Sequence, residues 1–312
     1  MVLCSLCKEK VAVIKIRYAN LALCKECFVK HFEEKVEKYL LDTNLSDKLN
    51  GKLIVVATSG GKDSLNTLFI LNKFKATYDF SLLALLIDEG IANYREYKRR
   101  ALESFCKKFK IDLLVISLYK ELGHTIDNVA KWYKEGKISL KPCSICGVFR
   151  RYLINLYANE LQADFVATGH NLDDEVQTFI MNFIRGDLLS IVREGPLTQT
   201  IFEGFVPRIK PLYYVYEKES LTYFLVNDLK TPYVECPYAR LSLRYRLRTL
   251  LNRLEYNSPG TKLKLLKLKD TLREELKDRV SMPKLRKCEL CGMPTVHKIC
   301  RACSIRLALS KV

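Results

Sequence analysis

A buried strand that runs straight into a glycine-rich loop constrains the fold of this chain more than any other feature. Residues 53–58 read LIVVAT, the loop SGGKDS occupies residues 59–64, and a helix is expected over 62–75. Glycines let the backbone turn tightly and approach a ligand without a Cβ in the way. Amide groups at the start of the helix then face an anion. The sequence therefore predicts a phosphate-binding loop, to which Lys62 adds a positive charge.

Short apolar runs and amphipathic segments alternate through the middle of the chain. Further strands are expected at 82–88, 113–118 and 164–168, with helices at 93–109, 144–161 and 172–184. This alternation predicts an α/β fold, a parallel sheet with helices on both faces. The chain is expected to be mostly helical after residue 215, with a break at 257–260 and a Lys/Leu-rich helix over 261–280.

Ten of the 12 cysteines form five pairs, each with two intervening residues. In a reducing compartment such pairs indicate metal or redox sites rather than structural disulfides. The spacing predicts one structural zinc ion near each end of the chain, with a redox dithiol as the alternative. The predicted ligands are Cys4, Cys7, Cys24 and Cys27 at the N-terminal end, and Cys288, Cys291, Cys300 and Cys303 at the C-terminal end. Cys106 falls on an apolar helical stripe and is expected in the core.

Three cysteines remain: Cys143, Cys146 and the distant Cys236. Three thiolates can hold three corners of a 4Fe–4S cluster, whose fourth iron is then open to a small ligand. A persulfide or disulfide at Cys143 and Cys146, or a zinc site completed by water, are the alternatives. The spacing alone does not choose among them.

The charge balance favours a polyanionic partner. Lys and Arg number 52 against 35 Asp and Glu, for a net charge of +17, and the simplest such partner is nucleic acid. Residues 240–253 contain no acid, and Arg240, Arg244 and Arg248 share one helical face beside a leucine stripe. We expect this face to contact RNA phosphates. No apolar run has the length of a membrane span and no signal-peptide pattern is present, so a cytoplasmic location is expected.

The loop does not fit a Walker A motif, because Val56 stands where that motif needs glycine and Asp63 follows the lysine. SGGKDS after a strand resembles the PP-loop of the ATP pyrophosphatase superfamily. That resemblance implies cleavage of ATP between its α and β phosphates, with AMP left on an oxygen of the substrate. It also implies a nucleotide site, with Asp63 and Asp174 as candidates to bind Mg²⁺ or orient the reacting groups. The nucleotide-binding residues it implies are Ala57, Ser59, Gly60, Gly61, Lys62, Asp63, Ser64, Ile87, Gly169 and His170.

Further motifs make the resemblance specific. They are PCSICGVFRR at 142–151, TGHNLDDE at 168–175 and VPRIKPL at 206–212. Together with the terminal cysteine pairs, they resemble the two-thiouridine synthetases of tRNA (the TtuA/TtcA type) over nearly the whole chain. The resemblance implies a 4Fe–4S cluster on Cys143, Cys146 and Cys236, and a catalytic role for Arg150 beside Asp63 and Asp174. The implied organisation is a zinc ribbon at 1–30, a helical linker at 31–50, a PP-loop domain at 51–255, a helical segment at 256–283 and a zinc module at 284–312.

The activity implied is ATP-dependent tRNA 2-thiolation, a tRNA sulfurtransferase reaction that adenylates the C2 oxygen of a uridine and replaces it with sulfur. The T-loop uridine 54 is favoured, with the wobble uridine or a cytidine as alternatives. The implied sulfur donor is a thiocarboxylated ubiquitin-like protein or free sulfide, and the implied assembly is a homodimer. Two other functions stay open: an amidating ligase of the same superfamily, and a zinc-dependent RNA-binding protein without catalysis.

Overall fold

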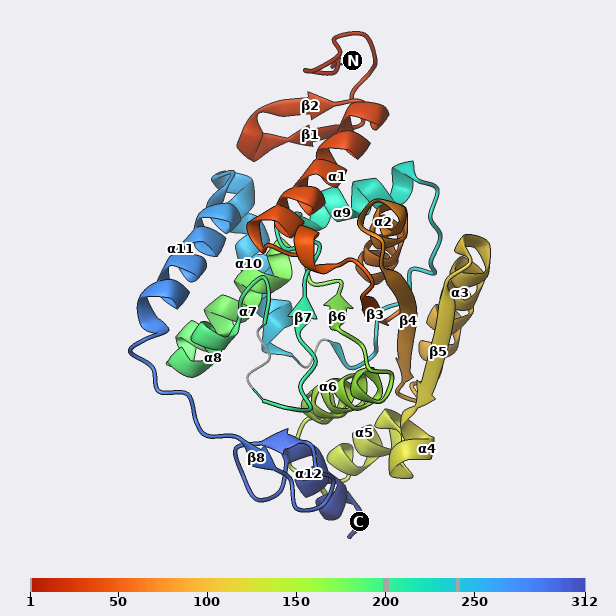
Figure 1. Ribbon diagram of the computed structural model, residues 1–312, viewed down its shortest axis with the longest axis vertical. Coiled ribbons are helices and arrows are strands. Elements are labelled where there is room, and N and C mark those ends of the chain that lie inside the picture. The colour runs from red at the N-terminus through yellow and green to blue at the C-terminus, as the bar shows by residue number, and fades with distance from the viewer. Residues whose placement is uncertain (1, 199–201, 240–241, 312) are drawn as a thin grey trace.

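A parallel five-stranded sheet forms the centre of the molecule (Figure 1). The computed structural model describes residues 2–198, 202–239 and 242–311. The strand order is β5–β4–β3–β6–β7, and each neighbouring pair is parallel. The strands are β3 (Leu53–Thr58), β4 (Ser81–Asp88), β5 (Asp112–Ser117), β6 (Phe165–Thr168) and β7 (Arg208–Ile209). The predicted α/β class is confirmed; the sequence did not predict β7, which is too short to leave an apolar run.

Two hydrophobic cores lie on opposite faces of this sheet. Ile54 and Val56 of β3 pack into one core, and Val55 between them packs into the other. Because both faces are buried, the strand reads as a continuous apolar run. The first core includes side chains of α1 (Lys25–Asp42), α2 (Lys62–Tyr78), α3 (Arg95–Phe109) and α7 (Leu172–Ile184). The second includes those of α4 (Leu118–Leu122), α5 (Ile126–Lys134), α6 (Pro142–Glu160) and α12 (Arg301–Leu309). Cys106 is buried in the first core, as predicted.

Helices dominate the chain after β7. The short α8 (Leu188–Arg193) precedes β7. After β7 come α9 (Glu217–Val226), α10 (Leu243–Asn257) and α11 (Thr261–Leu276), and then the C-terminal module with α12. Both α10 and α11 pack against α7, the helix that leaves the carboxyl end of β6. Arg240, the first arginine of the predicted RNA-contacting face, lies outside the described residues.

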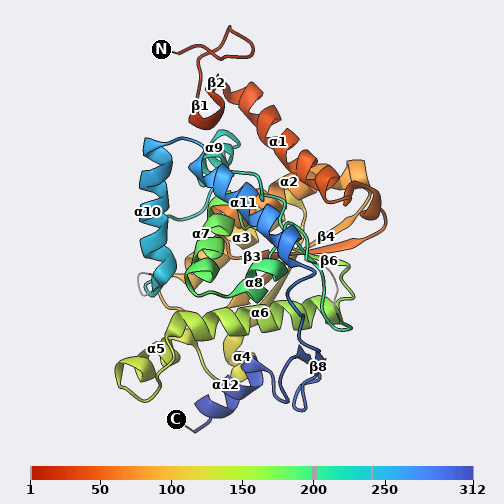
Figure 2. The same cartoon turned by 90° about the vertical axis from the view of Figure 1, so that its left-hand side faces the viewer.

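The two ends of the chain form small modules at opposite ends of the molecule (Figures 1 and 2). The N-terminal module contains the antiparallel pair β1 (Ile14–Ile16) and β2 (Leu21–Leu23), and the C-terminal one contains β8 (Arg286–Lys287) and β9 (Pro294–Thr295). In Figure 2, α6 lies between the sheet and the C-terminal module. The proposed domain boundaries stay predictions. Within the described residues, every helix is too short or too polar to span a bilayer.

Buried ion pairs fasten α11 to α7. Lys269 is 1% exposed, and its ammonium lies 2.5 Å from a carboxylate oxygen of Glu175. In the first turn of the same helix, Lys262 is 4% exposed and pairs with the buried carboxylate of Asp173. Buried charges cost free energy unless they are paired. The two pairs therefore fix the register of α11 on the helix that begins beside the glycine loop.

Removing one partner of such a pair leaves the other charge uncompensated. We expect Lys262→Met to lower the free energy of unfolding by about 3 kcal/mol, because Asp173 stays buried without its cation. The control Lys264→Met removes an exposed lysine of the same helix and is expected to change it by less than about 0.5 kcal/mol. Urea unfolding followed by circular dichroism measures both values. Equal stability of the two variants would contradict a buried, pair-dependent role for Lys262.

Candidate active site

The glycine loop lies between the end of β3 and the start of α2. Gly60 has φ +73°, and a Cβ there would stand 2.4 Å from the backbone oxygen of Lys98. Close approach also requires a glycine at position 169, where a Cβ would lie 2.8 Å from the amide nitrogen of Ser64. The hydroxyl of Ser64 donates to the Gly61 carbonyl at 2.9 Å. These contacts hold the loop against the neighbouring strand ends.

A cavity of about 340 Å³ opens beside this loop, at the carboxyl ends of β3, β4 and β6. Ligands of open parallel sheets bind at this edge. The predicted site residues that line the cavity are Ala57, Ser59, Gly61, Asp63, Ser64, Ile87, Arg150, Gly169, His170 and Asp174. Arg151 and Arg208 also line it. The structure thus brings most of the predicted nucleotide and catalytic residues around one cavity with arginine in its wall.

Two of the predicted nucleotide-binding residues, Gly60 and Lys62, do not line this cavity. The Lys62 ammonium lies 2.7 Å from Asp63 and 3.5 Å from Glu217, on the side of the loop that faces a second, larger cleft. Burial lowers the pKa of Lys62, but the nearby carboxylates of Asp63 and Glu217 outweigh it and raise that pKa. Lys62 therefore stays protonated, and its ammonium lies at the boundary between the nucleotide cavity and the larger cleft.

Asp63 and Asp174 both line the cavity. Ser220 donates to Asp63 at 2.6 Å, whereas the Arg244 guanidinium lies 3.3 Å from Asp174. Loss of water at Asp174 raises its pKa to about 6, an effect that Arg244 opposes and Asp63 reinforces. Two carboxylates beside a phosphate site suit Mg²⁺, which binds through one or two carboxylates and completes its shell with phosphate and water. The donor set therefore fits the predicted ion.

The three central cysteines lie on two segments that meet near the cavity, although none of the three lines it. Cys143 and Cys146 lie in the first turns of α6, and the chain returns with Cys236 in the segment before α10. The Cys143 thiol donates to the Tyr238 carbonyl at 3.1 Å, which ties the two segments together. Burial raises the pKa of the Cys146 thiol to about 12, despite the nearby Arg150. The three sulfur atoms do not form a group within 4.8 Å, and a cluster, which binds each thiolate to a different iron, fits such wider spacing better than one metal ion does.

A buried carboxylate, Glu89, was not predicted as a site residue. It links the glycine loop, through Arg95, to the cysteine-bearing helix α6, through Arg150. Glu89 is 1% exposed and follows β4 directly. It lies 2.5 Å from Arg95 and 3.6 Å from Arg150, and Arg95 donates to the Ser59 carbonyl at 2.8 Å. The signal that could have found Glu89 is its position, because an acidic residue at the carboxyl end of a buried strand lies at the binding edge.

The terminal cysteines form two compact groups of four, each with its sulfur atoms within 4.8 Å of one another. The Sγ atoms of Cys7 and Cys24 are 3.9 Å apart, and those of Cys291 and Cys300 are 3.7 Å apart. A tetrahedral zinc ion with Zn–S bonds of about 2.3 Å sets its sulfurs about 3.8 Å apart. Both groups therefore fit one zinc ion each.

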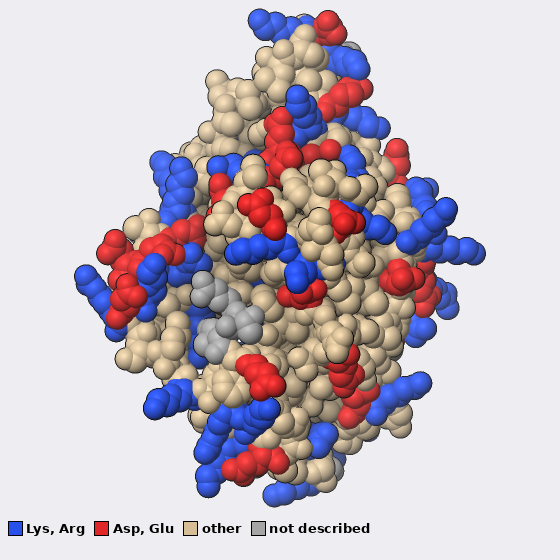
Figure 3. Space-filling model, in the orientation of Figure 1, with Lys and Arg blue, Asp and Glu red and all other residues tan. Residues whose placement is uncertain are grey.

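Two arginines of α10, Arg244 and Arg248, have carboxylate partners beside the site, whereas Arg246 and Arg253 are exposed. Arg244 lies against Asp174, and the Arg248 guanidinium lies 2.8 Å from Glu217. We predicted these side chains as phosphate contacts, but each already has a carboxylate partner at the site. On the face drawn in Figure 3, basic and acidic side chains are interspersed over the whole outline. Net charge alone therefore does not single out an RNA surface.

Comparison with known proteins agrees with this geometry. Residues 29–254 match the PP-loop domain family, and residues 3–29 match the N-terminal LIM domain of the 2-thiouridine synthetase TtuA. The chain is similar in structure to the U34-tRNA thiolase NcsA from Methanococcus maripaludis with its [4Fe-4S] cluster. That similarity has a TM-score of 0.82 and 31% identity, and it covers 97% of this chain and 95% of the thiolase.

Two curated relatives point the same way. A probable sulfurtransferase of Methanocaldococcus jannaschii is 37% identical over 95% of this chain and 85% of its own length. The tRNA-5-methyluridine(54) 2-sulfurtransferase of Pyrococcus horikoshii is 34% identical over 96% of this chain and 92% of its own. Near-complete coverage means that the loop, the cysteine segments and both ends share one ancestry with these enzymes. The chain belongs to the PP-loop family of tRNA 2-thiolation enzymes.

Proposed function

We propose that this protein replaces the C2 oxygen of a tRNA uridine with sulfur at the expense of ATP. The observation that carries the proposal is the meeting of Cys143, Cys146 and Cys236 beside a cavity lined by the glycine loop. An amidating ligase leaves these cysteines without a role, and a non-catalytic RNA-binding protein leaves the cavity without one. Nucleoside mass spectrometry of tRNA from a strain lacking the gene tests the activity directly, since the thionucleoside must disappear and return on complementation.

The first step activates the base. ATP binds with its phosphates on the loop amides and on Ser59 and Ser64. Asp63 and Asp174 would hold Mg²⁺, which would neutralise phosphate charge, and they orient the reacting groups. The uridine O2 attacks the α-phosphorus, so that the O2–P bond forms, the bond to the β-phosphate oxygen breaks and pyrophosphate leaves. The N3 proton of the base is lost in this step. Arg150, in the cavity wall, balances the charge that builds up on the phosphate.

The second step brings in sulfur as hydrosulfide. It attacks C2, the C2–O bond breaks, AMP leaves with the oxygen, and the proton of hydrosulfide replaces the one lost from N3. A 4Fe–4S cluster on Cys143, Cys146 and Cys236 would supply an open iron position for a small sulfur ligand. Water must be excluded here, because it would return the activated base to uridine; Ile87, which is 3% exposed, adds an apolar side chain to the cavity wall.

The target position divides the relatives. The P. horikoshii enzyme is named for uridine 54 and the M. maripaludis thiolase for uridine 34. We favour position 54, as the sequence resemblance implies, with position 34 as the second candidate. Digestion of tRNA into defined fragments before mass spectrometry separates the T-loop from the anticodon loop. The sulfur donor, the homodimer and the cytoplasmic location remain predictions.

A substitution at Gly60 tests the nucleotide loop. In Gly60→Ala the new Cβ would meet the Lys98 carbonyl at 2.4 Å, so the loop must move. A displacement of about 1 Å costs on the order of 10²-fold in rate, and we expect tRNA-dependent release of AMP and pyrophosphate to fall by that factor. The control Gly136→Ala has a similar φ, +71°, with nothing within 4 Å, and is expected to keep the rate. Release of ADP and phosphate by the unaltered protein would contradict a PP-loop mechanism.

A second test concerns the central cysteines. Cys236→Ser is expected to lose bound iron and thiolation while it retains ATP binding, because Cys236 does not line the nucleotide cavity. Cys106→Ala, which removes a thiol from the core, is the control and is expected to keep its iron. Iron analysis and visible absorption of anaerobically purified protein measure the difference. Thiolation by protein that contains no iron would favour a persulfide route instead.

The terminal modules are tested by metal content. We expect two zinc ions per chain, and one in either the double variant Cys4→Ser/Cys7→Ser or the double variant Cys288→Ser/Cys291→Ser. Because thiolate-bound structural zinc contributes to folding directly, each variant is also expected to unfold at a lower temperature. Elemental analysis and thermal melts provide the measurements. Two equivalents of zinc in either double variant would rule out its four-cysteine site.

A further inference from the structure

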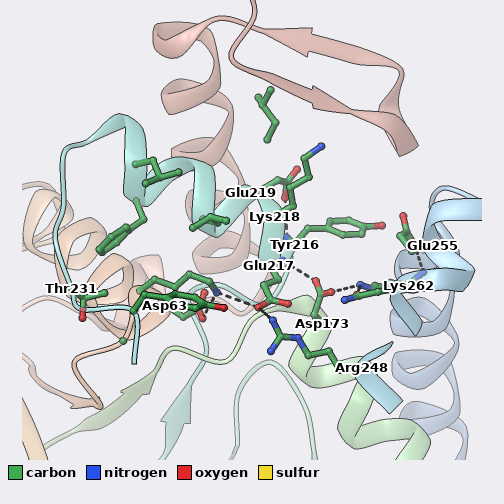
Figure 4. Close-up of a pocket in the computed structure, with 18 of the residues that line it drawn as sticks. Asp63, Asp173, Tyr216, Glu217, Lys218, Glu219, Thr231, Arg248, Glu255 and Lys262 are labelled. Atoms are coloured by element: carbon green, nitrogen blue, oxygen red, sulfur yellow. Dashed lines mark hydrogen bonds and ion pairs between the residues drawn. The ribbon is translucent and has the colours of Figure 1, made fainter. Parts of the chain in front are cut away.

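A second and larger cleft meets the glycine loop from the side opposite the nucleotide cavity (Figure 4). Its volume is about 840 Å³, and its walls are the β1 end of the N-terminal module, α9, α10 and the segment 231–235. It shares Gly61 and Asp63 with the nucleotide cavity. The cleft therefore leads from the surface to the loop residue that we place beside the reacting phosphate.

Four acidic side chains along this cleft are paired with cations, whereas Glu235 and Glu255 have no cationic partner among the described residues. Glu217 lies between Lys62 and Arg248, and Asp173 pairs with Lys262 (Figure 4). Glu219 is 2.6 Å from Lys35. The paired carboxylates add little net negative charge to the cleft.

Apart from Lys98, which is 7% exposed and donates to the Pro232 carbonyl, three cations of the cleft have no carboxylate partner among the described residues. Lys15 and Arg17 extend from the N-terminal module and Lys218 from α9. Within the part of the chain that the structure describes, each lies more than 4.0 Å from any carboxylate. Lys218 donates to the backbone carbonyl of Lys15, and Arg17 donates to the backbone carbonyl of Tyr256. These hydrogen bonds bring the three cations to one rim of the cleft. Their charge is available to an anion from outside.

Large apolar and aromatic side chains are exposed along the same cleft. Tyr233 is 95% exposed and Tyr256 is 72% exposed, and both line the cleft. Leu221 and Leu225 of α9 add an apolar floor at 44% and 61% exposure. Aromatic rings beside cations are the combination by which proteins hold unpaired nucleotides, because bases stack on the rings and phosphates meet the charges.

We propose that this cleft takes up unpaired nucleotides of the RNA substrate. Phosphates bind Lys15, Arg17 and Lys218, bases stack on Tyr233 and Tyr256, and the cleft delivers the target pyrimidine to Asp63. The assignment rests on the proposed thiolation of tRNA and adds where the RNA lies. The sequence predicted phosphate contacts at Arg244 and Arg248 of α10, which are paired with carboxylates; this proposal places the contacts instead on the rim formed by the N-terminal module and α9.

Binding of an unmodified tRNA transcript across a range of salt concentrations tests the rim. The triple variant Lys15→Ala/Arg17→Ala/Lys218→Ala is expected to flatten the slope of log K against log [salt] by about 2, since each of the three lost phosphate contacts to a single strand removes about 0.7. The control is Lys75→Ala/Lys107→Ala/Lys108→Ala, which removes the same charge from exposed sites on α2 and α3. Equal slopes for the two triple variants would overturn the assignment.

Substitution of Tyr233 tests the stacking. Tyr233→Ala is expected to weaken binding of the transcript by about 5- to 100-fold, and Tyr233→Phe to restore it, because the ring rather than the hydroxyl stacks. The side chain is 95% exposed, so its removal leaves the core intact. Binding of Tyr233→Ala as tight as that of the unaltered protein would overturn the stacking role.

Thiolation assays separate the two levels of inference. If the unaltered protein neither thiolates the transcript nor releases AMP with it, the proposed function itself fails. If the unaltered protein thiolates while both cleft variants bind RNA as the controls do, only the cleft assignment fails. A third outcome would also overturn the assignment. If the cleft variants bind RNA normally and lose thiolation only when a carrier protein supplies the sulfur, the cleft binds that carrier rather than RNA.

Discussion

The buried carboxylate of Glu89 is the contact on which the geometry of the site depends. It lies between Arg95, whose guanidinium reaches the Ser59 carbonyl, and Arg150, which follows the cysteines on α6. A carboxylate that is 1% exposed would be costly without partners. With both arginines in place, the end of β4, the glycine loop and α6 are held in one arrangement. This pairing therefore fixes the loop that lines the cavity and the helix that carries Cys143 and Cys146 relative to each other.

Local patterns predicted the elements that build this cavity. LIVVAT and SGGKDS carry their own signals, apolar residues and glycines, so β3 and the turn into α2 could be read directly. The same holds for the terminal cysteine pairs, whose spacing predicts two compact groups of four sulfur atoms. Gly169 and His170, which follow β6 and were predicted near the nucleotide, line the cavity. Parallel strands bring such residues to one edge whatever their distance in sequence.

Side-chain direction and pairing could not be predicted in this way. Lys62 lies in the glycine loop but turns away from the nucleotide cavity, because Asp63 and Glu217 attract its ammonium. Arg244 and Arg248 form a basic face in the sequence, yet tertiary packing supplies each with a carboxylate. Both outcomes depend on partners far along the chain. The two-residue strand β7 was not predicted for a related reason, since its pairing with β6, rather than its own composition, makes it a strand.

The placement of the three sulfur sites along the chain has a consequence for biosynthesis. The N-terminal group of four is complete once Cys27 has been made, the central group needs Cys236, and the last needs Cys303. Domains fold in the order in which the ribosome releases them. The N-terminal four cysteines can thus come together while most of the chain is still unsynthesised, whereas the central cysteines meet only after the sheet has formed. A ligand of the first group could therefore bind during translation, whereas any ligand shared by the three central cysteines must wait for a largely folded chain.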